Sequence, residues 1–285
     1  MLALLAAAAL QFSETDAKVA YEAAKEIVES CTPRDAGTIR GRIAANRILD
    51  LASGVGADVR RDIFDAETPS GVRSFANLYA EFRGNPTNRW VVLLSHYDTK
   101  PGSGCPGAND GASTSGLLIS LANVLSNARN RTGNVLLVWT DGEESQGPHY
   151  TEKDGFQGSK RAVQHVREKG YDVQAVLCLD MLGDRDLNIS IPSNGHETLA
   201  RIALHATRRA GFPGLVKRLP LEVKDDHVAF LDAGYKAIDL IDFDYGSKPG
   251  ANDYWHTKDD TMERVSQESL LKSGRLVVEM LNILL

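Results

Sequence analysis

The chain has 285 residues, of which 42% are hydrophobic and 25% are charged, and its formal net charge at pH 7 is -6. This composition is typical of a globular protein, and the length suits one large α/β domain. The acidic balance argues against a nucleic-acid partner, because such a partner requires a basic patch on the protein.

The first ten residues are apolar but too few to span a bilayer, so no membrane span is expected. They resemble the apolar core and small-residue end of a secretory signal that lacks its basic start. We therefore expect residues 1–12 to be a truncated signal segment and residues 13–285 to form a single domain. A secreted or periplasmic location follows from this interpretation. The alternative is that these residues begin an amphipathic helix.

The first half of the chain alternates between helical and strand-like patterns. Apolar residues recur at helical spacing over 17–30 and 38–52, and each segment follows a residue able to cap a helix. Residues 74–82 alternate loosely and precede a turn at 85–88, which predicts a hairpin into the next strand. Short runs rich in Val and Leu at 91–94 and 135–139 predict buried strands, separated by a helix at 112–128.

The second half continues the same alternation after an irregular loop at 145–158. The pattern predicts helices at 159–169, 199–210 and 267–284 and strands at 174–179, 187–191 and 237–241. A short helix is expected at 228–231, with Asp225 and Asp226 as its caps. The predicted fold class is therefore α/β.

Ligand-type residues follow the predicted strands at the points where these strands end. The relevant residues are His96 and Asp98 after the first run, Glu143 and Glu144 after the second, Asp180 after the third, Asp110 in a glycine-rich turn, and His256 in a late loop. Sites in such sheets lie at the carboxyl ends of the strands, so these side chains should converge. Two adjacent glutamates repel each other unless a cation or a shared proton relieves them, and a metal ion is the expected relief.

Imidazole nitrogens and carboxylate oxygens suit zinc, and a catalytic zinc ion keeps one coordination position open. If Asp110 bridges two ions, His96 and Asp180 can complete one site while Glu144 and His256 complete the other. Ions paired in this way lie about 3.5–4 Å apart. The sequence leaves open whether one ion or two are bound.

Two further acidic residues are assigned supporting roles. Glu143 cannot easily bind the same ion as its neighbour and is left as the general base, which takes a proton from the attacking water and delivers it to the leaving amine. Asp98 is placed to orient the imidazole of His96. Taken alone, each of these residues is more often a cap or a surface side chain. Together they indicate a metal site, because four separate elements end in residues of ligand type.

The motifs His96-Tyr97-Asp98, Asn109-Asp110, Glu143-Glu144, Asp180 and His256-Thr257 resemble the co-catalytic zinc exopeptidases of the bacterial leucyl aminopeptidase type, a family of clan MH that also contains animal-type glutaminyl cyclases. The resemblance covers the chain from about residue 75 to the C-terminus. It implies a single-domain, three-layer α/β/α fold with a central mixed, mostly parallel sheet. It also implies the ligand set given above for one or two Zn²⁺ ions, peptide or protein N-termini as substrates, and a cis peptide after Asp110.

The cyclase branch of this family is an open alternative. Residues 225–231 and 255–260 look closer to glutaminyl cyclases than to the best-known aminopeptidases. In that branch Asp225 would join Asp180 in an acidic hydrogen-bond network, and Trp255 would form a wall of the substrate pocket. Tyr150 occupies a pocket position at which cyclases tend to carry tryptophan.

Three functions therefore follow from the sequence. The first is a zinc-dependent aminopeptidase that hydrolyses N-terminal residues from peptides, with Glu143 as base. The second is a glutaminyl-peptide cyclotransferase, which forms N-terminal pyroglutamate. An inactive metal-binding module is the third, and the intact Glu143 argues against it.

Overall fold

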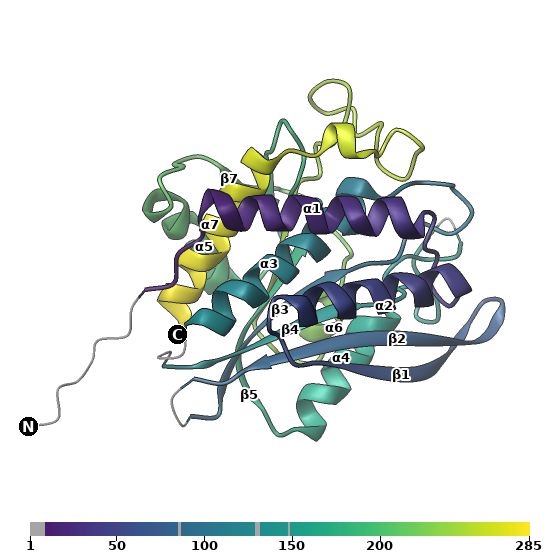
Figure 1. Cartoon of the computed structure of the whole chain (residues 1–285), viewed down its shortest axis with the longest axis horizontal. Coiled ribbons are helices and arrows are strands. Elements are labelled where there is room, and N and C mark those ends of the chain that lie inside the picture. The colour runs from purple at the N-terminus through teal and green to yellow at the C-terminus, as the bar shows by residue number, and fades with distance from the viewer. Residues whose placement is uncertain (1–8, 85–86, 129–131, 148) are drawn as a thin grey trace, which may run out of the picture.

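One mixed sheet of eight strands forms the centre of the molecule, as a computed structural model of residues 9–84, 87–128, 132–147 and 149–285 shows (Figure 1). The strands lie in the order β1-β2-β4-β3-β5-β8-β6-β7. Their bounds are β1 Val59–Thr68, β2 Gly71–Phe82, β3 Arg89–His96, β4 Asn134–Thr140, β5 Asp172–Asp180, β6 Ile189–Ile191, β7 Val216–Arg218 and β8 Ala237–Ile241. The central strands β4, β3, β5 and β8 are parallel, and β1 and β2 add an antiparallel edge. The predicted mixed α/β sheet is confirmed.

Helices cover both faces of this sheet and complete the three layers (Figure 1). One face carries α1 (Glu14–Cys31), α2 (Ile39–Gly54), α3 (Thr114–Asn127), α5 (Glu197–Arg209) and α7 (Gln267–Leu284). The other face carries α4 (Gln157–Glu168) and α6 (His227–Asp232). Two short helical turns, η1 (Ala108–Ser113) and η2 (Met262–Arg264), complete the elements described.

Burial on both faces explains the apolar runs of the central strands. In β3, Val91 and Leu93 pack in the larger core with α1 and α3, whereas Val92 and Leu94 pack in the smaller core with α4. A strand covered on both faces needs apolar residues at every position, because successive side chains point to opposite faces. The run from 91 to 94 therefore shows no polar alternation.

Side-chain caps define the starts of several helices. The Ser13 hydroxyl accepts a hydrogen bond from the Asp16 amide, and the Asp16 carboxylate accepts one from the Ser13 amide. Ser266 caps α7 by accepting from the Ser269 amide at 3.1 Å. Such caps satisfy amides that have no partner within the helix. The bounds of α7 agree with the predicted helix at 267–284.

Leu10 and Phe12 belong to the packed body of the protein. Both side chains are buried, and the Asn282 side chain of α7 bonds to the backbone N–H and C=O of Leu10 at 2.8 and 3.0 Å. The ring of Phe12 lies directly over Gly274. The predicted boundary at residue 12 therefore falls inside the packed region, whereas residues 1–8 lie outside the described part of the chain. Among the described residues no helix is long and apolar enough to cross a membrane.

The predicted hairpin from residues 74–82 into the next strand is wrong. Strand β2 pairs with β1 and β4, both in antiparallel orientation, and not with β3. Both edges of β3 are already taken by the parallel strands β4 and β5, so no edge remains for β2. Residues 85–86 of the predicted turn lie outside the described residues.

Candidate active site

Three adjacent parallel strands and two loops bring the predicted ligands together. His96 ends β3, Asp180 ends β5, and Glu144 follows the end of β4, so all three lie at the carboxyl edge of the sheet. Asp110 lies in η1, the turn that enters α3, and His256 lies in the loop after β8. The predicted convergence at this edge is present in the structure, as the general rule for open α/β sheets requires.

The turn at Asp110 depends on the glycine that follows it. Gly111 has a φ of 90°, and a Cβ at this position would lie 2.7 Å from the carbonyl oxygen of His96. Only glycine therefore allows this left-handed turn to pack against the end of β3. The expected cis peptide after Asp110 is wrong, since the cis bond among the described residues is Thr32–Pro33. The left-handed conformation of Gly111 turns the chain with a trans bond instead.

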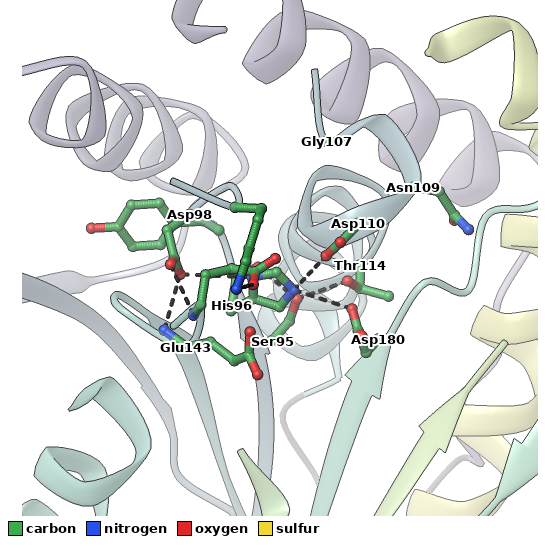
Figure 2. A network of polar contacts seen from close by, with 12 residues as sticks. Ser95, His96, Asp98, Gly107, Asn109, Asp110, Thr114, Glu143 and Asp180 are labelled. Carbon is green, nitrogen blue, oxygen red and sulfur yellow. Dashed lines mark hydrogen bonds and ion pairs between the residues drawn. The ribbon is translucent and has the colours of Figure 1, made fainter. Parts of the chain in front are cut away.

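The first group of ligands surrounds the imidazole of His96. Its Nε2 atom lies 3.0 Å from Asp110 Oδ1 and 3.2 Å from Asp180 Oδ1 (Figure 2). All three side chains are buried. Burial alone lowers the pKa of His96, but the hydrogen bonds to Asp110 and Asp180, together with the nearby carboxylate of Asp98, raise it well above its ordinary value. The carboxylates thus favour a positive charge at the point where they converge.

The second group of ligands shares Asp110 with the first. His256 Nε2 lies 2.8 Å from Glu144 Oε1 and 3.4 Å from Asp110 Oδ2. Asp110 therefore directs one carboxylate oxygen to each histidine. In each group, one ligand atom from every residue lies within 4.8 Å of the others. This is the arrangement expected of a carboxylate that bridges two metal ions.

The donor atoms fit a pair of divalent cations. Each group combines one imidazole nitrogen with two carboxylates, a set that suits divalent metals that take nitrogen and oxygen ligands. Glu144 Oε2 is buried and has no hydrogen-bond partner among the described residues. Burial and then the charge of Asp110 raise the pKa of Glu144. The ammonium group of Lys100 lies 3.7 Å from this Oε2 atom, and a metal ion would relieve the repulsion more directly.

Asp98 binds the backbone of the glutamate pair. Its two carboxylate oxygens accept hydrogen bonds from the backbone amides of Glu143 and Glu144, each at 3.2 Å (Figure 2). Its Oδ1 lies 3.6 Å from His96 Nδ1, which is beyond hydrogen-bond distance. The structure therefore shows Asp98 fixing the segment that carries both glutamates. The orientation of the His96 ring by Asp98 stays a prediction.

Glu143 lines the cavity and belongs to neither ligand group. Burial, followed by the charge of Glu144, raises the pKa of Glu143 well above its ordinary value. The Tyr150 hydroxyl donates a hydrogen bond to Glu143 Oε1 at 3.1 Å. The Tyr150 ring stacks on Phe156 at 4.4 Å, and Gly155 leaves the space that this ring occupies. Tyr150 is thus held in contact with the predicted general base.

A cavity of about 250 Å³ opens beside these groups. Its lining includes carboxylates of both groups and Glu143, together with the predicted pocket residues Asp225, Trp255 and Tyr150. Val223, Ile241 and Phe243 add apolar surface. The Trp255 ring stacks on the imidazole of His256 at 3.9 Å. The cavity therefore combines an acidic region with an apolar wall.

A buried acidic cluster extends from the cavity into the interior. The Cys178 thiol donates a hydrogen bond to Asp225 Oδ1 at 3.3 Å, and Asp239 of β8 is fully buried near both. Burial and then the Asp180 charge raise the pKa of Asp225 to about 7. Asp226 occupies the N-cap position of α6, as predicted, but its side chain makes no capping hydrogen bond. Its carboxylate instead accepts a hydrogen bond from the hydroxyl of Thr140.

Three buried charged residues near the site were not predicted from the sequence, namely Arg34, Asp239 and Asp260. The one usable signal was Asp239, since a single acid interrupts an otherwise apolar strand. His227 is buried outside both ligand groups, and burial lowers its pKa to about 4. All three cysteines are buried and free.

Residues 77–281 match the model of peptidase family M28. The chain is 26% identical over 282 residues to a glutaminyl-peptide cyclotransferase-like protein of Bos taurus, which covers 86% of this chain and 70% of that protein. It is 29% identical over 195 residues to aminopeptidase YwaD of Bacillus subtilis, covering 66% of this chain and 39% of that protein. Similarity therefore extends to both kinds of enzyme.

Solved structures with the same fold were also found. A glutaminyl cyclase from an Acidobacteriales bacterium superposes with a TM-score of 0.86 at 28% identity, covering 100% of this chain and 98% of that one. A leucine aminopeptidase precursor from Bacteroides thetaiotaomicron gives a TM-score of 0.82 at 22% identity and shows the shared fold.

Proposed function

Because the chain belongs to peptidase family M28, we propose that it is a zinc-dependent aminopeptidase that removes residues from the free N-termini of peptides. The observation that carries this proposal is the sharing of Asp110 between two complete ligand groups. Two ions held by these groups would clamp both the attacking and the developing oxygen of a hydrolytic step. The relatives include both aminopeptidases and cyclases, and the choice of hydrolysis is our proposal, supported by the two ligand groups that share Asp110.

Zinc is the proposed metal because imidazole and carboxylate ligands in groups of three suit it and leave one position open. His96, Asp110 and Asp180 would hold one ion, while Glu144 and His256 would hold the other together with Asp110. Bound zinc supplies Lewis acidity, which lowers the pKa of water and polarises a substrate carbonyl.

The residues around the two ligand groups perform the proton transfers and position the substrate. Glu143 lines the cavity and is placed to take the proton from the attacking water and to deliver it to the leaving amine. The hydrogen bond from Tyr150 fixes the orientation of its carboxylate. The acidic lining attracts the protonated N-terminus of a peptide. The apolar wall at Phe243 and Trp255 can accommodate the first side chain of the substrate.

Glutaminyl cyclisation is the second candidate function, and two specific observations favour it. The cyclase from an Acidobacteriales bacterium aligns with the whole of this chain. Asp225 and Trp255, the two residues that the cyclase resemblance singles out, also both line the cavity. In this reaction the N-terminal amine attacks the side-chain amide of glutamine and ammonia leaves.

One experiment separates the two reactions. The purified, zinc-loaded protein is incubated with a Leu-peptide and with a Gln-peptide, and the products are identified by mass spectrometry. We expect release of free leucine, because hydrolysis needs no glutamine side chain. Pyroglutamate formation without amino-acid release would refute the aminopeptidase and establish the cyclase. No turnover of either peptide would favour the inactive metal-binding module.

We further propose that the protein acts outside the cytoplasm, on the basis of the apolar residues 1–10. Expression of the full chain followed by cell fractionation tests this. We expect the protein in the periplasmic or secreted fraction, and retention in the cytoplasm would refute the proposal.

A further inference from the structure

Arg34 is a fully buried cation placed beside the ligand residue Asp110. It lies between α1 and α2, outside residues 77–281 that match the family model. Its side chain is 0% exposed. Within the described residues no carboxylate lies within ion-pair distance of its guanidinium group. A buried charge of this kind is tolerated only when its hydrogen bonds are satisfied elsewhere.

Backbone carbonyl groups satisfy the guanidinium group of Arg34. Its Nε donates to the carbonyl oxygen of Tyr97, the residue after the ligand His96. Its Nη1 and Nη2 donate to the carbonyl oxygens of Pro106 and Gly107 at 2.7 and 2.6 Å. One rigid planar group therefore joins the end of β3 to the loop that leads to Asp110.

Glycine at position 107 allows the close approach of Arg34. A Cβ on Gly107 would lie 2.7 Å from Arg34 Nη2 and 2.5 Å from Thr99 Cγ2. The backbone at Gly107 also has a φ of 62°, in the left-handed region. Arg34 and this loop therefore fit together only because residue 107 has no side chain.

Asp260 holds the amide groups of the same loop from its other side. Its Oδ1 accepts from the Asn109 amide at 2.7 Å, and its Oδ2 accepts from the Asp110 amide at 3.2 Å. The hydroxyl of Tyr245 donates to Oδ1 at 2.7 Å. The Asp260 side chain is also 0% exposed. The loop thus directs its carbonyl groups to a buried cation and its amide groups to a buried anion.

We propose that Arg34 and Asp260 form a charge clamp that holds the loop 107–110 in the conformation required for Asp110 to bridge two metal ions. The metal ligands repel one another before the ions bind, because three carboxylates converge there. Bonds made to the backbone hold Asp110 in place without competing for its carboxylate oxygens. Arg34 and Asp260 are therefore positioning residues for the metal centre, and this role rests on the proposed metal site.

The experiment measures zinc affinity directly, by chelator competition on the metal-free full-length protein. We expect Arg34→Lys to weaken zinc binding by about 10–100-fold, the usual range for residues that support metal ligands. A lysine ammonium cannot span the carbonyl groups that the guanidinium fork joins. The matched control is Arg161→Lys, because Arg161 bonds Asp62 at 2.7 Å and pairs with none of the ligands. The zinc affinity of this variant should equal that of the wild type.

A milder variant keeps the proposal testable if Arg34→Lys does not fold. Tyr245→Phe removes one hydrogen bond to Asp260 and changes no charge, and we expect a severalfold loss of zinc affinity with an unchanged circular dichroism spectrum. Equal zinc affinities for wild type and every folded variant would overturn the clamp. A wild-type protein that binds no zinc would instead refute the proposed function, so the two failures are distinguishable.

Discussion

Replacing Glu143 with glutamine separates catalysis from metal binding. The amide has nearly the same shape as the carboxylate, and its oxygen can still accept the hydrogen bond that Tyr150 now donates at 3.1 Å. Glu143 belongs to neither ligand group, so Glu143→Gln should retain the wild-type metal content. Removal of its charge also removes the repulsion with Glu144, so the metal-free variant should be no less stable than the wild type.

The expected loss of activity follows from the chemistry of proton transfer. A general base contributes about 10²–10⁴-fold to the rate, so kcat of Glu143→Gln should fall by that factor. This corresponds to about 2.7–5.4 kcal/mol of transition-state stabilisation. The assay is release of free leucine from a Leu-peptide, measured together with zinc content. Glu152→Gln, a change at an exposed glutamate of the same loop, is the matched control. Full loss of zinc from Glu143→Gln would show that the roles of the two glutamates are wrongly assigned.

Three further changes test other parts of the site. Glu144→Ala and His256→Ala each remove a ligand from the same group, so metal analysis should show that both variants lose zinc. Full zinc content in either variant would contradict the ligand assignment. Tyr150→Phe removes the hydrogen bond to Glu143 but keeps the aromatic ring. We expect kcat to fall about tenfold, with a smaller change in KM. An unchanged kcat would mean that Tyr150 only lines the pocket. Burial raises the pKa of Asp239 well above its ordinary value of 3.8, so its contribution to stability is present below pH 3.8 and is lost as the pH rises through the folded-state pKa. Asp239→Asn should therefore gain thermal stability over the wild type as the pH rises from 4, and parallel curves of melting temperature against pH would count against this.

Most helices and strands could be predicted from the local pattern of apolar residues in the sequence. The helix at 267–284 was found because its apolar residues recur at helical spacing and are buried on one face of the sheet. The strands at 91–94 and 135–139 were found because helices cover them on both faces, so every position is apolar. β1 was missed because Val59–Thr68 contains five charged residues, which an edge strand tolerates and an internal strand does not. The hairpin failed because strand order is set by long-range pairing, which local alternation does not encode.

The metal ligands could be predicted because parallel strands end at one edge of the sheet. His96 and Asp180 follow apolar runs, so their side chains had to lie near one another. Arg34 and Asp260 gave no such signal. Arg34 bonds carbonyl groups more than 60 positions away in the sequence, and Asp260 bonds amides about 150 positions away. Their contribution appears only when the chain is folded.

The central claim is that Asp110 bridges two metal ions, and anomalous scattering at the zinc edge tests it most directly. Crystals of the zinc-loaded protein should give two anomalous peaks about 3.5–4 Å apart, one on each side of the Asp110 carboxylate. His96 and Asp180 should contact the first peak, and Glu144 and His256 the second. One peak alone, or two peaks that do not share Asp110, would contradict the two-metal account.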